Sequence, residues 1–375
     1  MVQRFSRLDS VWLMLILVVG LANPVYSAFG HPPEAEKDTL EEKRNGFLFI
    51  PVLYYTPETG VAGGVAANYY FRERNSQSSS KPSSILPLFV YTQKKQIISL
   101  FILDLYLKNE NVHLENNINF LKFPDTFYGI GNRTPEENEE DYTPQNFTLE
   151  VKFWSRVRSK LYIGVGYDFS DWRLKETEDG GLLSGTYIPG SEGCRTSGIG
   201  LLMKWDTRDE LFYPSSGYFL QLFSTFYADR LGSDYDFNIY EADIRRYFSL
   251  FTSHVIAVQG FIKMTTGDPP FQMLSRLGGP ELLRGYYEGR YRDRDMLVFQ
   301  TEYRLPLWRK FGAVAFAGLG DVASELRSFQ TKYGKYAAGV GLRYMLNTKE
   351  KINIRFDVAF GKDTSGFYIT MLEAF

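Results

Sequence analysis

Residues 146–157 read NFTLEVKFWSRV, and apolar and polar side chains alternate along this stretch. From Phe147 to Phe153 every odd position is apolar, while the even positions between them are Thr, Glu and Lys. A period of two places the two sets on opposite faces of a β-strand. Residues 299–305 and 352–358 alternate in the same way, so the pattern recurs along the chain.

The alternating segments are long and follow one another through most of the sequence. They have about ten to fifteen residues, whereas soluble strands have about five or six and membrane strands about nine to eleven. The predicted strands are 47–56, 61–73, 85–95, 96–107, 110–121, 146–157, 159–173, 197–207, 216–228, 234–247, 251–266, 295–305, 311–322, 336–346, 351–361 and 366–375.

The connections between these strands alternate between short and long. The longest are 122–145, 174–196, 267–294 and 323–335. All four follow odd-numbered strands, as in outer-membrane barrels whose long loops lie on one side. We therefore predict an all-β fold, a closed 16-stranded antiparallel transmembrane β-barrel, because closure leaves no backbone edge unpaired in lipid.

Composition and charge exclude several other classes of protein. Aromatic residues make up 16% of the chain, with 33 glycines, as expected for a β-rich chain with many turns. The mean hydropathy of −0.25 excludes a bundle of membrane helices. A net charge of −2 provides no basic face for nucleic acid. Cys194 is the single cysteine, which excludes an internal disulfide and a cysteine-based metal cluster. We expect no metal and no cofactor.

The first 46 residues have the composition of a targeting signal followed by a disordered tail. Residues 1–27 are predicted to be a cleaved signal peptide, because Arg4 and Arg7 precede an apolar stretch that ends in small residues. Residues 28–46 are rich in Pro, Glu and Lys, which predicts a short disordered periplasmic tail. The barrel domain is then 47–375, in a bacterial outer membrane whose lipid surrounds it.

The longest connection contains residues 277–290, which read LGGPELLRGYYEGR. A solvent-exposed loop has no packing reason to hold Leu-Leu-Arg-Gly-Tyr together. Gly285 permits close backbone approach, Tyr286 supplies a ring that packs, and the guanidinium of Arg284 forms forked bonds to a carboxylate. This pattern predicts a loop tip that folds into a narrow space.

Here the sequence resembles the bacterial surface-antigen superfamily of outer-membrane barrels, which includes BamA-type assembly factors and two-partner secretion transporters. Their sixth outer loop carries an Arg-Gly-Phe/Tyr motif that folds into the barrel, and Arg284, Gly285 and Tyr286 match it. The resemblance therefore implies an inward-folded outer loop, a latch. It also implies client proteins or a separately encoded periplasmic partner.

Two further blocks match this family. The turn before residue 218 resembles the family's turn between strands eight and nine, and its matching residues are Asp206, Arg208, Asp209, Pro214 and Gly217. Asp and Pro shape such a turn, and glycine relieves the start of the next strand. Phe375 resembles the C-terminal aromatic by which such barrels are recognised for insertion, although Glu373 stands where an apolar residue is usual.

The latch partners differ in part from the family pattern. Glu302 matches the first acid that meets the loop arginine, but the second position reads Phe316-Ala317-Gly318 and lacks the aspartate. Asp357 is the better second candidate, because it shares the lumenal parity of Arg355.

Two functions remain open at this point. The resemblance implies a barrel that inserts or translocates proteins, or assists lipid or protein assembly, at the outer membrane. The alternative is a passive pore or structural barrel without assembly activity, since a barrel of this size encloses an aqueous lumen. We expect no enzyme, because the adjacent strand residues Ser253 and His254 face opposite sides and cannot form a nucleophile–base pair.

Overall fold

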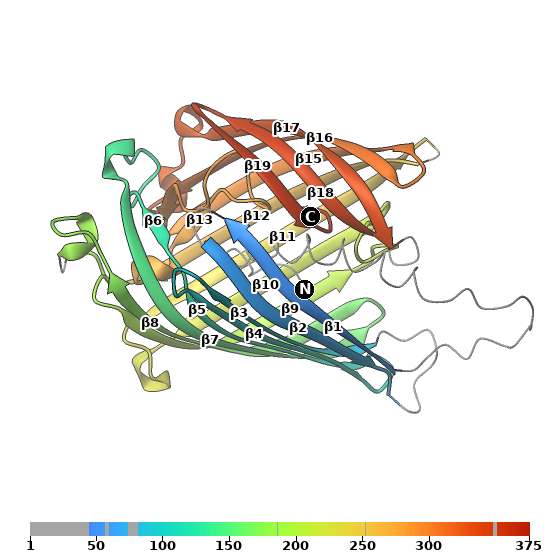
Figure 1. Ribbon diagram of the computed structural model, residues 1–375, viewed down its shortest axis with the longest axis horizontal. Coiled ribbons are helices and arrows are strands. Elements are labelled where there is room, and N and C mark those ends of the chain that lie inside the picture. Colours follow the sequence, from blue (N-terminus) through green and yellow to red (C-terminus); the bar gives the residue numbers. More distant parts are fainter. Residues whose placement is uncertain (1–44, 57–59, 74–81, 186, 252, 348–350) are drawn as a thin grey trace, which may run out of the picture.

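The structure is a computed structural model that describes residues 45–56, 60–73, 82–185, 187–251, 253–347 and 351–375 (Figure 1). In this part of the chain every element longer than three residues is a β-strand. None of its helices has the length and apolar character needed to cross a membrane. The predicted all-β class is therefore confirmed.

Long strands form the main sheet, which we call the wall, and short strands and 3-10 turns lie in the connections between them. The long strands are β1 (Asn45–Thr56), β2 (Gly60–Phe71), β3 (Ser83–Thr92), β4 (Ile97–Leu107), β5 (Val112–Lys122), β7 (Glu140–Arg158), β8 (Leu161–Glu176), β9 (Cys194–Asp206), β10 (Gly217–Tyr227), β11 (Phe237–Leu250), β12 (His254–Gly267), β15 (Asp295–Trp308), β16 (Phe311–Ala323), β17 (Lys335–Asn347), β18 (Ile352–Gly361) and β19 (Thr364–Met371). The short ones are β6 (Asp125–Phe127), β13 (Ser275–Leu277), β14 (Tyr291–Asp293) and the 3-10 turns Glu136–Asn138, Leu182–Ser184, Asp229–Leu231, Phe271–Met273, Leu326–Ser328 and Thr331–Tyr333.

Seventeen strands form one sheet, and every pairing within it is antiparallel. Neighbours in the chain are neighbours in the sheet, except that β5 pairs with β7 and β12 pairs with β15. The short β6 pairs only with the start of β7, beyond a break at Pro124 where a strand cannot donate a hydrogen bond. No pairing among the described residues joins β1 to β19, so they are the free edges of the sheet (Figure 1).

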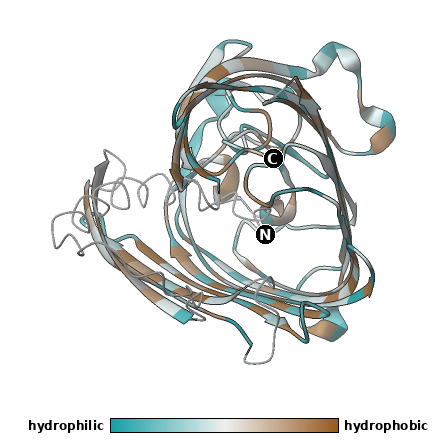
Figure 2. Ribbon diagram, turned by 90° about the vertical axis from the view of Figure 1, so that its right-hand side faces the viewer, coloured by the Kyte–Doolittle hydropathy of each residue, from teal (hydrophilic) through white to brown (hydrophobic). Residues whose placement is uncertain are grey.

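The sheet curves around a central space, as Figure 2 shows in a view along the strands. We call the end with the tight turns, such as 308–311, the turn end, and the opposite end the loop end. Alternate residues face inward and outward: on β11 Arg245 and Tyr247 are buried, while Ile244 and Phe248 are exposed. The outward face exposes many large apolar side chains, as a surface that contacts lipid requires.

The inward face differs around the wall. On β2 to β5 it holds a buried apolar cluster that includes Ala62, Val90, Ile98 and Leu121. Closer to the turn end, β4 and β5 add the buried polar residues Asp104, His113 and Glu115. On β15 to β18 the inward face carries further buried charges, among them Glu302 and Asp357 (see below). The inner surface is therefore largely polar, with one apolar cluster.

Several predicted element limits differ from the structure, and three of the differences matter here. β1 begins at Asn45, within the predicted tail 28–46. The predicted signal peptide and residues 28–44 of the predicted tail lie outside the described part of the chain. β7 begins at Glu140, so it takes up the last part of the predicted loop 122–145. The final strand ends at Met371, because the positive φ of Leu372 turns the chain away from the sheet.

The end of the chain consequently lies inside the barrel. Phe375 is 3% exposed and packs in a cluster with Tyr247, Val255 and Ala257. The backbone oxygen of Phe375 accepts a hydrogen bond of 2.6 Å from Arg304. The predicted strand 366–375 placed this aromatic side chain in the wall, and that placement is wrong. Its role in barrel insertion stays a prediction.

Candidate functional site

The loop between β12 and β15 folds inward and lies against the wall at β16. Its two ends pair as the hairpin β13–β14. Glycines in the wall make room for it: a Cβ at Gly318 would lie 3.0 Å from Leu283 Cδ1, and a Cβ at Gly320 would lie 3.0 Å from Leu277 Cδ1. Side chains of the loop thus occupy the space that wall side chains would otherwise fill, as the sequence predicted for this loop tip.

Arg284 lies at the centre of this contact. Its side chain is 1% exposed, and its two terminal nitrogens reach two different acids. Nη2 forms an ion pair with Glu302, and Nη1 lies 2.5 Å from Asp357 Oδ2. The guanidinium also lies 3.5 Å from the ring centroid of Phe316. The structure therefore brings together the predicted latch residue and both predicted partners, and it adds a cation–π contact to Phe316, two residues before Gly318, where the family pattern has its aspartate.

More charged residues join this network than the sequence predicted. Glu302 also pairs with Arg304 at 2.9 Å, and Asp357 pairs with Arg343 at 2.5 Å. Arg343 in turn lies 2.8 Å from Glu373. Each of these buried acids is shared between donors, which stabilises its charge.

Glu373 is the residue that sequence reasoning missed most clearly. It stands at a position expected to be apolar, yet its second oxygen accepts a 2.9 Å hydrogen bond from Asn353. A carboxylate close to strands with inward Arg343, Asn353 and Arg355 was the available signal.

Gly285 and Tyr286 attach the loop to the edge strands. The Gly285 amide donates to the hydroxyl of Tyr368 at 2.9 Å, and its φ of +112° suits glycine. The hydroxyl of Tyr286 donates to the Tyr336 carbonyl at 3.1 Å and accepts from the Lys362 amide at 3.0 Å. The motif thus contacts β17, β19 and the turn before β19, in addition to the acids.

Replacing Tyr286 by phenylalanine should lower the free energy of unfolding by about 1–3 kcal/mol. The variant leaves a carbonyl at Tyr336 and an amide at Lys362 without their side-chain partner in a partly buried site. Urea unfolding measures this loss, with the folded fraction read from the different gel mobilities of the folded and unfolded barrel in unheated samples. Tyr187→Phe is the matched control, because Tyr187 is 94% exposed. Equal losses in the two variants would contradict the anchoring role.

The stability of the loop should also depend on pH through Glu281. Removal from water raises the pKa of this carboxyl group to about 7, while Arg355 and Arg245 lower it and Glu288 raises it. The folded protein therefore binds this proton more tightly than the unfolded chain, so stability falls as pH rises from about 4.5 to about 7. Glu281→Gln should be more stable than the wild type at pH 8 and equal to it at pH 4.

Urea unfolding midpoints of both proteins across this pH range test the expectation. Glu137→Gln provides the control, because Glu137 is an exposed acid on an outer loop. A difference between Glu281→Gln and the wild type that does not change with pH would contradict the role assigned to this proton.

The turn motif forms a compact cluster at the turn end. Arg208 donates to Asp206 at 2.9 and 2.7 Å. Asp209 accepts from the backbone of Ser215 at 2.9 Å. Burial raises the pKa of Asp209, but hydrogen bonds from this segment outweigh it and hold the pKa below its ordinary value. Gly217 has a φ of +105°, and a Cβ there would meet the backbone of the preceding strand end.

Pro214 completes the turn motif and is buried at the turn end. The structure places this cluster apart from the loop motif, and Tyr213 is the nearest link, with its ring 5.6 Å from the guanidinium of Arg304. The two motifs are therefore separate parts of the inner surface.

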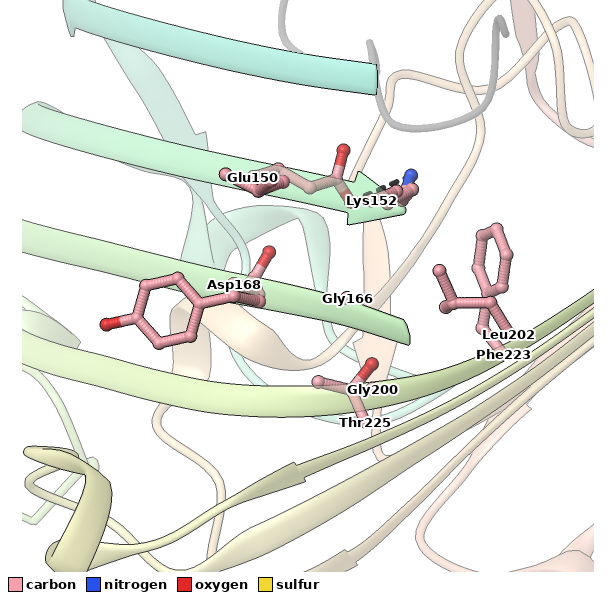
Figure 3. Close-up of a pocket in the computed structure, with 10 residues that line it drawn as sticks. Glu150, Lys152, Gly166, Asp168, Gly200, Leu202, Phe223 and Thr225 are labelled. Atoms are coloured by element: carbon pink, nitrogen blue, oxygen red, sulfur yellow. Dashed lines mark ion pairs between the residues drawn. The ribbon is translucent and has the colours of Figure 1, made fainter. Parts of the chain in front are cut away.

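A small hollow in the wall lies where β8 and β9 carry glycines (Figure 3). Gly166 and Gly200 are register partners, and the Glu150–Lys152 ion pair of 2.9 Å lies beside them. The cavity has a volume of about 10 Å³, close to that of a single water molecule. Small-molecule sites are usually about 300–1,000 Å³, so this hollow is too small for a substrate.

Comparisons with known proteins agree with this fold. BamA from Haemophilus ducreyi lacking POTRA domains 1–3 is similar with a TM-score of 0.58 and 12% identity, over 94% of this chain and 77% of that one. CdiB from Acinetobacter baumannii is similar with a TM-score of 0.54 and 12% identity, over 88% of this chain and 59% of that one. No curated protein sequence matches the chain. A family model described as the Omp85 superfamily domain matches residues 80–375, and the chain therefore belongs to the Omp85 superfamily.

Proposed function

We propose that this protein is an outer-membrane barrel that inserts or translocates proteins, or assists their assembly with lipid, at the bacterial outer membrane. The observation that carries the proposal is the buried Arg284, which ties the inward loop to Glu302 and Asp357 within an Omp85 fold. A loop fixed in this way leaves the lumen partly filled. A fixed inward loop narrows the lumen, and we propose that it serves as a gate when the barrel handles client chains.

In the membrane we propose a closed wall. If β5 and β6 count as one strand interrupted at Pro124, the seventeen strands of the sheet become sixteen. Each unpaired backbone group in hydrocarbon costs several kcal/mol, so β1 and β19 should pair there. The same edges, when apart, offer a row of backbone donors and acceptors to which a strand of a client protein adds.

The turn end provides a surface for a periplasmic partner. A cavity of about 280 Å³ opens there between four turns, and its lining includes Arg309, Lys310 and Lys351. Lys351 forms an ion pair with Glu210, and the other two basic side chains are exposed. We propose that acidic segments of a client or partner approach the barrel at this end.

A passive pore is the second candidate, and one observation favours it. The inward face of β7 to β9 carries Glu150, Lys152, Asp168 and Lys204, which are typical of an aqueous channel wall. We propose no catalytic role in either case. The ring of His254 contacts Tyr303 on the outward face, with 2.6 Å between Nδ1 and the hydroxyl, whereas Ser253 has the inward parity of Val255.

A deletion strain distinguishes the two functions. Under the first proposal, loss of the gene lowers the level of outer-membrane proteins or alters surface lipid, and the wild-type gene restores both. Complementation with Arg284→Ala should restore them only in part, whereas Arg327→Ala, an exposed arginine on an outer loop, should restore them fully. Unchanged protein and lipid profiles, together with measurable single-channel conductance, would establish the passive pore instead.

A further inference from the structure

A single arginine interrupts the apolar outer surface of β10 to β12. Arg246 has the outward parity of Ile244 and Phe248 on β11. Among the described residues of these three strands it is the only charged side chain that faces outward. The other outward positions of these strands carry apolar side chains, Ser, Thr, Asn, Tyr, His or Gly.

Aromatic rings hold the guanidinium of Arg246 in place. Its Cζ lies 3.6 Å from the ring centroid of Tyr218 and 4.8 Å from that of Phe248. Trp205 stacks on Tyr218 with 6.1 Å between the centroids and 4° between the planes. In the described part of the protein these cation–π contacts are accompanied by no ion pair to Arg246. The positive charge is thus oriented but not neutralised.

The position of Arg246 along its strand sets its depth. β11 ends at Leu250 on the turn end, four residues later. At about 3.3 Å per residue and a tilt of about 40°, this places Arg246 roughly 10 Å from the strand end along the barrel axis. An arginine at the bilayer midplane costs about 2–4 kcal/mol, but close to the interface the cost falls to about 0–1 kcal/mol. The side chain is therefore within reach of the lipid headgroups.

We propose that Arg246, with Tyr218 and Phe248, binds the phosphate headgroup of an anionic phospholipid in the leaflet at the turn end. The inference rests on the membrane location of the proposed function. The planar guanidinium offers paired donors to phosphate oxygens, and the rings fix its orientation before the lipid arrives. The aliphatic outward residues beside it, such as Ile244, provide a surface for the acyl chains.

Lipid retention tests the site directly. Wild type, Arg246→Gln and Arg246→Lys are placed in bilayers of phosphatidylethanolamine with about one-fifth phosphatidylglycerol, released in mild detergent, and weighed by native mass spectrometry. One basic residue near a charged surface contributes about 1 kcal/mol, which is about five-fold in affinity. Phosphatidylglycerol retention should fall about five-fold in Arg246→Gln. It should fall less in Arg246→Lys, because lysine keeps the charge but lacks the paired donors of the guanidinium.

Matched variants separate the site from total charge and from folding. Arg327→Gln removes the same charge from an exposed outer loop and should retain lipid like the wild type. Phe248→Leu keeps the charge of Arg246 but removes one ring, and it should also lose retention. Heat-modified gel mobility shows that each variant is folded, and if Arg246→Gln does not fold, Phe248→Leu decides the result.

Each remaining outcome has a defined meaning. If Arg246→Gln and Phe248→Leu retain as much phosphatidylglycerol as the wild type, the proposal is overturned. If water-soluble glycerophosphoglycerol displaces the retained phosphatidylglycerol, the proposal is also overturned, because the site would then bind a free phosphate ester and not a lipid. A wild type that enters bilayers but does not prefer phosphatidylglycerol overturns the lipid site and leaves the proposed function intact. A wild type that enters no bilayer overturns both.

Discussion

Replacing Arg284 by alanine should lower the free energy of unfolding by about 3–5 kcal/mol, because it removes one partner from two buried ion pairs. Glu302→Gln should cause a similar loss, since it leaves both Arg284 and Arg304 without that carboxylate. The double variant should lose less than the sum of the two single losses, because both variants remove the same Arg284–Glu302 ion pair. Urea unfolding of the purified barrel measures all three values.

The control for this cycle is Arg327→Ala, which removes an exposed arginine from an outer loop and should change stability by less than about 0.5 kcal/mol. Fully additive losses in the double variant would show that Arg284 and Glu302 act independently. A loss in Arg284→Ala no larger than that of the control would show that the loop is held by packing alone.

Gly341→Ala should displace the loop that carries Arg284, although a Cβ at this position would contact Asp357 and not the loop itself. Gly341 is the register partner of Asp357, and a Cβ at this position would overlap the Asp357 carboxylate and lie 2.6 Å from Nη1 of Arg343. Asp357 must move, so its ion pair with Arg284 weakens. We expect a loss of about 3 kcal/mol, in the upper part of the range for overpacked interiors.

Two measurements check this expectation. Urea unfolding gives the stability, and limited digestion with trypsin reports whether the bond after Arg284, buried in the wild type, becomes accessible. Gly260→Ala is the control, because a Cβ on this strand glycine would meet nothing within 4 Å. Trypsin resistance in Gly341→Ala equal to that in Gly260→Ala would contradict the link between Gly341 and the loop.

Most of the wall could be predicted from local sequence. The alternation between residues 299 and 305 identifies β15 and places Glu302 on the same face as Gln300 and Arg304, as the structure has them. Parity depends only on the period of the strand, so it needs no knowledge of other strands. For the loop, the residues Arg284, Gly285 and Tyr286 predicted a tip in a narrow space, and the family resemblance implied that it folds into the barrel.

The network around that loop was predicted only in part. Parity alone made Asp357 a candidate, but nothing local indicates that Arg284 reaches it across 73 residues of chain. The segment Phe316-Ala317-Gly318 was noted only for the aspartate that it lacks, and the structure shows the ring of Phe316 beneath the guanidinium. Contacts of this kind depend on how β15, β16, β17 and β18 are staggered, which is a property of the whole sheet.

By itself, the sequence determined most of the strands and the faces of their side chains, because these follow from short-range periodicity and turn chemistry. It also located the loop that carries the motif, through three residues that match a family pattern. Tertiary structure alone decided that Glu373 pairs with Arg343, that Phe375 leaves the last strand for the lumen, and that β1 and β19 are free edges. These features join residues far apart in the chain, and their energies depend on burial and register that no local pattern records.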